Sequence, residues 1–153
     1  MIVVSDTSPL AYLVAIEIVD CLPILYGQVY VPPAVAAELQ HSSCPAANWM
    51  ARSPDWLKIM APREQLAELE LDAGEREAIA LALELDAEHL LIDERKGRVA
   101  AKAVGLHVAG TLAVILDAAS EGLCDGHVAL DKLERTGFYA SPDLLHMIRK
   151  KLT

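Results

Sequence analysis

Two aspartates each follow a short apolar run and precede a predicted helix. Asp6 follows residues 2–5, and Asp93 follows residues 90–92. Short apolar runs of this kind predict buried strands. A buried carboxylate costs free energy unless another group binds it. Because ligands of open α/β sheets bind at the carboxyl ends of strands, we predict that both acids belong to a ligand site.

The rest of the chain predicts alternating strands and helices. Such alternation implies βαβ crossovers and a mostly parallel sheet with helices on both faces, an α/β fold. The composition, 54% hydrophobic but only 5% aromatic, favours an aliphatic core of this kind. At 153 residues the chain is expected to form a single domain, residues 1–153. The predicted strands are residues 2–5, 28–31, 56–60, 89–92 and 106–109, and the predicted helices are residues 9–16, 19–25, 33–40, 46–51, 63–69, 74–85, 94–104, 112–121, 128–135 and 142–152.

Local signals mark several helix ends. Ser8 before Pro9 predicts an N-cap followed by proline at the first helical position. Asp72 and Glu75 fit a capping box. Gly105 predicts the end of the helix before the fifth strand.

The cysteines and the amino terminus indicate a reducing compartment. The three cysteines are widely spaced and form no CxxC, so we expect neither a disulfide framework nor a zinc site. The first residues lack the basic region of a signal peptide, and no apolar run of about 18 residues predicts a membrane span. A cytoplasmic location is therefore expected, with no membrane association.

Charge is unevenly distributed. The formal net charge of −9 argues against bulk affinity for nucleic acid. Residues 64–88 carry nine acids and only one base, so the remainder of the chain is nearly neutral. Two basic clusters remain, and each is either a solvated helix face or a phosphate contact: Arg95, Lys96, Arg98 and Lys102, and Arg149, Lys150 and Lys151.

Each candidate carboxylate has a structural alternative. Asp6 and Asp93 could cap the helices that follow them. Glu38, beside the apolar face of its helix, reads on its own as an exposed glutamate. Glu75 and Glu77 project in opposite directions from one helix, so at most one of them can enter a shared site.

Converging carboxylates without His or Cys ligands favour Mg²⁺ or Mn²⁺ over zinc. Such ions polarise a phosphoryl oxygen and activate a water molecule. The five histidines show no HExxH spacing, and no glycine-rich nucleotide loop is present.

Four segments together resemble a known family. They are residues 5–10, which contain Asp6, residues 31–38, which end at Glu38, residues 74–82, which contain Glu75, and residues 90–98, which contain Asp93. In this order they resemble the PIN domain, the metal-dependent nuclease fold of VapC-type toxins. They are most similar to an uncharacterised PIN-like subfamily with a GExEA helix and a DERxGR loop, and residues 137–139 also resemble that group.

The resemblance implies a three-layer α/β/α fold with strand order 3-2-1-4-5 and a helical C-terminus. It implies that Asp6, Glu38, Glu75 and Asp93 are catalytic and that Asp6, Glu75 and Asp93 bind Mg²⁺ or Mn²⁺. Glu75 departs from the aspartate common at the third position, and Leu91 stands where most relatives have threonine. The residues expected to assist substrate binding are Ser8, Arg95, Lys96, Arg98 and Thr111.

The resemblance, together with the strand-end acids, implies a metal-dependent endoribonuclease that cleaves single-stranded RNA, the toxin of a type II toxin–antitoxin module. The expected partners are RNA, a cognate antitoxin and a second copy of the chain, with the apolar residues of the last helices available for protein contacts or for the core. The alternative is a catalytically weak PIN-like module that binds nucleic acid or protein, consistent with the net charge and with Glu75. A small-ester phosphatase would need an aspartate where Ser8 stands.

Overall fold

The structure, a computed structural model, describes residues 1–152. The strands are β1 (Ile2–Ser5), β2 (Gln28–Val31), β3 (Leu57–Ile59), β4 (His89–Leu91) and β5 (Val108–Ala109). The helices are α1 (Thr7–Ala15), α2 (Cys21–Tyr26), α3 (Pro33–Gln40), α4 (Ala47–Ala51), α5 (Ala73–Glu84), α6 (Arg95–Ala103), α7 (Thr111–Ser120), α8 (Gly126–Arg135) and α9 (Pro142–Lys151). No helix among residues 1–152 has the length and apolar character needed to cross a membrane.

The five strands form one parallel sheet with β1 at its centre. The strand order β3-β2-β1-β4-β5 confirms the predicted order. Ser5 is in register with Leu91 of β4, and the Asp6 N–H donates to the Leu91 carbonyl at 2.8 Å. The ends of β1 and β4 therefore lie side by side, which brings the positions of Asp6 and Asp93 to the same edge of the sheet, as predicted.

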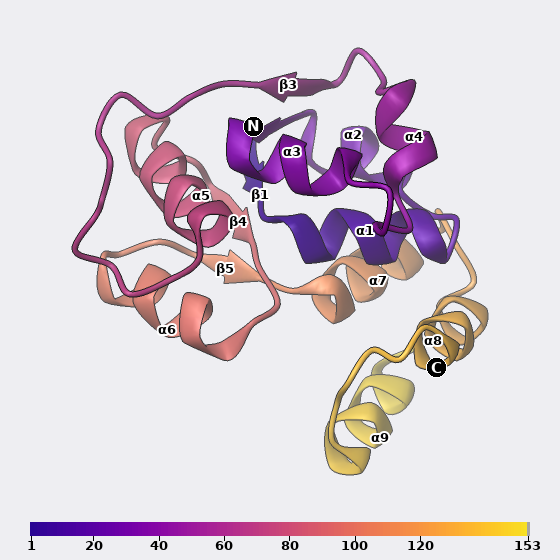
Figure 1. Cartoon of the computed structure of the whole chain (residues 1–153). Helices are drawn as coiled ribbons and strands as arrows, with labels where there is room; N and C mark the ends of the chain where they lie inside the picture. The colour runs from indigo at the N-terminus through magenta and orange to yellow at the C-terminus, as the bar shows by residue number, and fades with distance from the viewer. Residues whose placement is uncertain (153) are drawn as a thin grey trace.

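Alternate residues of the central strands face opposite helical layers. Val3 and Leu91 belong to a buried cluster with residues of α1, α2 and α7. Val4 and Leu90 belong to a second cluster with residues of α5 and α6. Because both faces are covered, the strands read as continuous apolar runs. Figure 1 shows these two layers around the sheet, which confirms the predicted α/β/α class.

The helix predicted at residues 63–69 does not form. Figure 1 shows an irregular connection between β3 and α5 there. The backbone N–H groups of Arg63 and Glu64 donate to the Glu84 carboxylate at the end of α5, at 2.7 to 3.1 Å. Leu66 and Leu69 of this segment pack against the second cluster. Tertiary contacts here override the local apolar period.

One predicted helix start is also wrong. Helix α1 begins at Thr7, so Ser8 lies inside the first turn and Asp6 occupies the N-cap position. In contrast, Asp72 caps α5 by accepting from the Glu75 N–H at 2.8 Å, as predicted. Gly105 follows the end of α6 with a φ of 88°, a left-handed conformation that glycine adopts without strain.

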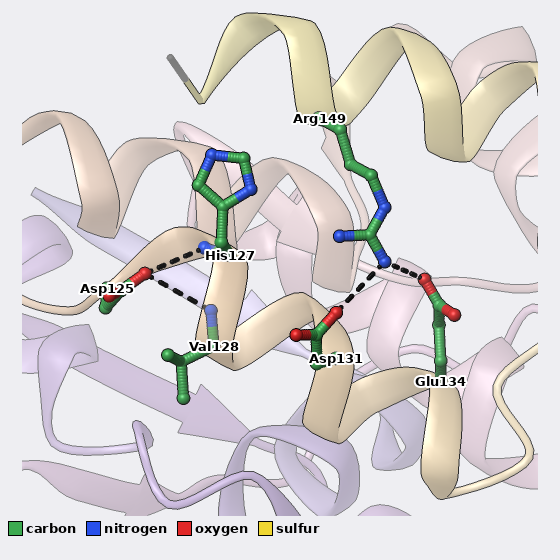
Figure 2. Close-up of polar contacts among 6 residues, drawn as sticks. All are labelled: Asp125, His127, Val128, Asp131, Glu134 and Arg149. Carbon is green, nitrogen blue, oxygen red and sulfur yellow. Dashed lines mark hydrogen bonds and ion pairs between the residues drawn. The ribbon is translucent and has the colours of Figure 1, made fainter.

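Helices α8 and α9 form the C-terminal end of the molecule beside α7 (Figure 1). Ile148 is the buried residue of α9. Figure 2 shows Arg149 of α9 reaching Asp131 and Glu134 of α8, and Asp125 capping the start of α8. Arg149 thus joins two helices, which gives this member of the basic tail a structural role.

We predict that Ile148→Ala lowers the free energy of unfolding by about 2 to 4 kcal/mol because it leaves a cavity under α9. Arg149→Ala should change it little, since its ion pairs are partly exposed. Urea denaturation of both variants checks this ranking. A larger loss for Arg149→Ala would mean that charge, and not apolar contact, seats α9.

Candidate active site

Asp6 lies at the end of the central strand with a carboxylate that does not cap the next helix. Its side chain makes no capping hydrogen bond, although its backbone occupies the N-cap position of α1. The side chain is buried, at 6% exposure. Burial raises the pKa of Asp6 to about 7, against the lowering effect of the Thr7 N–H, and nearby Asp72, Glu38 and Asp93 raise it further. The capping alternative therefore fails for Asp6, and its neighbours are other acids.

Glu38 reaches Asp6 from helix α3. The Thr7 hydroxyl donates to Glu38 Oε2 at 2.7 Å. Glu38 Oε1 and Asp6 Oδ1 both lie within 3.5 Å of the point where a Cβ atom on Gly74 would stand. Glu38 is exposed, as its sequence context alone suggested, and it is also a neighbour of the buried Asp6.

Glu75 contributes a third carboxylate from the first turn of α5. It is 5% exposed, and among residues 1–152 its Oε2 is one of two buried side-chain polar atoms without a hydrogen-bond partner. Burial raises its pKa to about 8, with further contributions from a hydrogen bond to Asp72 and from the charges of Asp72 and Asp6. Glu77 turns away from Glu75 and accepts from the Ala34 N–H at 3.1 Å, so Glu75 is the inward member of the pair.

Asp93 is fixed at the end of β4 by Thr111. The Thr111 N–H donates to Asp93 Oδ1 at 2.7 Å, and its hydroxyl donates to Oδ2 at 2.8 Å. Burial raises the pKa of Asp93, while these hydrogen bonds and nearby Arg98 lower it. Thr111 is fully buried. It therefore positions Asp93 and places a hydroxyl beside this acid, where most relatives have one from a threonine at the Leu91 position. Its predicted contact with substrate stays a prediction.

Three glycines make room for these carboxylates. A Cβ on Gly74 would lie 2.5 Å from Glu38 Oε1, one on Gly97 would collide with Glu75 Oε2, and one on Gly110 would lie 2.9 Å from Asp93 Oδ1. Sequence reasoning missed these positions and also Asp72, whose charge acts on both Asp6 and Glu75. The available signal was Gly97 inside a helix, where glycine costs about 1 kcal/mol relative to alanine.

The basic residues of α6 occupy different surroundings. Arg95 and Lys96 are exposed and line a groove with Ser8 and Asp93. Arg98 is partly buried, and it donates to the Ile92 carbonyl at 3.0 Å. Thus Arg95, Lys96 and Ser8 are open to a ligand next to the acids, whereas Arg98 also supports the end of β4.

The donor set fits a hard divalent cation. Among residues 1–152, no three His, Cys, Asp or Glu side chains form a ready-made metal site. Mg²⁺ needs no such cage, because it keeps several waters and binds through one or two carboxylates plus a substrate phosphate. The unpartnered Glu75 oxygen is consistent with an ion among these acids. Asp6, Glu75 and Asp93 are the acids predicted from the family resemblance to hold such an ion, and this assignment stays a prediction.

Comparison with known proteins identifies the family. A family model described as a PIN domain matches residues 2–153, so the chain belongs to the PIN domain family. No curated protein and no solved structure matches the chain. PIN domains are generally metal-dependent nucleases, which makes this chain a nuclease-type hydrolase by class.

The raised pKa values predict a pH-dependent stability in the absence of metal. The pKa values of Asp6 and Glu75 in the folded protein lie above their unfolded values of 3.8 and 4.5. Their contribution to folding stability is therefore complete below about pH 4 and is lost as the pH rises through about 7 and 8. Asp6→Asn should therefore change the free energy of unfolding more favourably at about pH 8 than at about pH 5. The difference between the two effects should be about 2 kcal/mol. Urea denaturation in EDTA checks this, with Asp55→Asn, an exposed acid outside the site, as the control. An equal effect at both pH values would contradict it.

Gly97→Ala should displace Glu75 because the new methyl group occupies the space of its carboxylate and meets Ile92 Cδ1 at 2.6 Å. We expect the Mn²⁺-induced rise in melting temperature to fall by at least half. Val99→Ala, an exposed position in the same helix, is the matched control and should keep the full rise. A full rise in Gly97→Ala would show that Glu75 is not needed for the ion.

Proposed function

We propose that the chain, as one domain, is a metal-dependent endoribonuclease that cleaves single-stranded RNA. The observation that carries the proposal is the convergence of Glu38, Glu75 and Asp93 on Asp6 at the end of β1, in a chain of the PIN family. Mg²⁺ or Mn²⁺ suits an all-carboxylate site.

The four acids take different parts in this proposal. Asp6, Glu75 and Asp93 hold the ion, which when bound polarises a phosphoryl oxygen and activates water. Glu38, oriented by the Thr7 hydroxyl, faces Asp6 and is placed to accept a proton from a water molecule. Thr111 and the β1–β4 register keep the two aspartates at neighbouring strand ends.

The first turn of α6 supports a phosphate-binding role. Arg95 and Lys96 stand at a helix N-terminus, where the helix dipole disfavours cations. That local cost is offset if these side chains contact RNA phosphates along the groove that Ser8 and Asp93 also line. Residues 64–88, with nine acids and one base, carry most of the net charge of −9, and Arg95 and Lys96 lie outside that acidic block.

We further propose that the chain acts as the toxin of a type II module, with a cognate antitoxin and a homodimeric assembly. Exposed apolar residues near the C-terminus support a protein contact: Leu144 and Met147 of α9 are 38% and 50% exposed. The test is growth arrest on expression and its relief by the product of the neighbouring reading frame. Size measurement in solution tests the dimer.

The alternative is a binding module without turnover. The net charge of −9 and the glutamate at position 75, where aspartate is common in the family, support it. Thermal denaturation with Mn²⁺ separates the two, because a ligand that binds the folded state raises the melting temperature by mass action. No response to millimolar Mn²⁺ would support the binding module.

We predict that the wild-type chain cleaves unstructured RNA with Mg²⁺ or Mn²⁺, and that Asp6→Asn and Asp93→Asn each lower kcat/KM by at least a hundredfold. Each substitution removes a negative charge from the proposed metal site while keeping the side-chain shape. Gel analysis of end-labelled RNA, single-stranded and duplex, measures the rates.

The control is Asp125→Asn, because Asp125 caps the start of α8 (Figure 2) and is not one of the four acids of the proposed site. It should cleave as the wild type does. If Asp6→Asn and Asp93→Asn also cleave at the parental rate, the site is wrongly assigned.

A further inference from the structure

A second depression meets the acid site at Asp93. It has a volume of about 360 Å³, within the range of small-molecule sites, and lies between α7, α9 and residues 138–140. Its polar end is formed by Asp93, Arg98 and Gly110. The remaining wall is apolar and consists of Leu112, Ala113, Leu116, Ala140, Leu144 and Ile148.

Phe138 and Tyr139 separate this apolar pocket from the groove at the start of α6, whose charged lining residues are Asp93, Glu94, Arg95 and Lys96. Both residues line both depressions. The ring of Phe138 packs edge-on against Tyr12 of α1, with centroids 5.0 Å apart and an interplanar angle of 85°. Phe138 is thereby anchored, whereas Tyr139 is 88% exposed. Because the Tyr139 ring is exposed to solvent, packing in the core does not account for an aromatic residue at this position.

We propose that the pocket binds one unpaired nucleobase of the RNA, with Tyr139 stacking on that base. The inference rests on the proposed function and names how that site selects its substrate. The cations Arg95 and Lys96 lie on one side of Phe138 and Tyr139, suited to phosphates, and the apolar wall lies on the other, suited to a base. Asp93 belongs to both depressions, so a base in the pocket is adjacent to the acids that act on its phosphate.

The chemistry of the wall favours a nucleobase. Bases stack on aromatic side chains whatever their sequence, because every base has a π-face. Arg98 at the polar end offers guanidinium N–H donors to the acceptor groups of a base. A base paired in a duplex cannot leave its partner without the cost of unpairing, so the pocket selects single strands.

The test is binding of a nine-nucleotide single-stranded RNA by fluorescence anisotropy in EDTA, where metal-dependent cleavage does not occur. Tyr139→Ala should weaken binding about tenfold, the cost of losing one stacked base. Tyr139→Phe should bind within about twofold of the wild type, because it keeps the ring. Leu144→Trp, which fills the pocket from a partly exposed position, should weaken binding like Tyr139→Ala. Ile24→Ala, an exposed apolar residue of α2, is the control for lost apolar surface and should bind normally.

Base identity at the pocket is tested with RNAs that carry 2-aminopurine or an abasic site at successive positions. At one position, 2-aminopurine fluorescence should be quenched by the wild type and not by Tyr139→Ala. The RNA that is abasic there should bind equally to both proteins.

If Tyr139→Ala binds and cleaves RNA as the wild type does while Asp6→Asn is inactive, the base subsite is wrong and the nuclease proposal stands. That result would leave the pocket as a protein-docking surface. If the wild type neither binds nor cleaves any RNA with Mn²⁺, both proposals fall together.

Discussion

The mutual repulsion and burial of carboxylates around Asp6 is the constraint on which the rest of the structure depends. The central position of β1 brings strand-end Asp6 beside β4 and Asp93, while α3 and α5 add Glu38 and Glu75. Without a counter-ion such an arrangement opposes folding, because burial and like charge both disfavour the ionised forms. The apolar clusters on the two faces of the sheet supply the folding free energy that offsets the cost of burying these carboxylates.

Specific hydrogen bonds orient these acids, and glycine residues beside them leave room for their carboxylates. Thr7 orients Glu38 and Thr111 orients Asp93, so these two side chains do not rotate freely. Glycines 74, 97 and 110 leave out a methyl group beside the carboxylates. Gly97 lowers the intrinsic stability of α6, a local cost that makes sense where the helix must approach Glu75 closely.

The C-terminal helices extend the site as well as the core. Ile148 buries one side of α9, and Arg149 links it to α8 (Figure 2). Phe138 lies against Tyr12, and Phe138 and Tyr139 form the boundary between the apolar pocket and the groove that contains Arg95 and Lys96, both of which Asp93 also lines. A backbone phosphate and a base require opposite surroundings, and this boundary provides both next to the acids.

The sequence by itself determined the alternation of strands and helices, the parallel sheet and the strand-end placement of Asp6 and Asp93, because these follow from local apolar runs and helix signals. It also identified Asp72 as the cap of α5. It misread residues 63–69, since the Glu84 carboxylate that binds their N–H groups lies about 20 positions away in the chain. The family resemblance already indicated Glu75. Only the tertiary structure decided that Glu77 turns away to the Ala34 N–H, that Thr111 binds Asp93 through both its N–H and its hydroxyl, and that three glycines make room for the acids. Those features depend on contacts between distant segments, which no local pattern records.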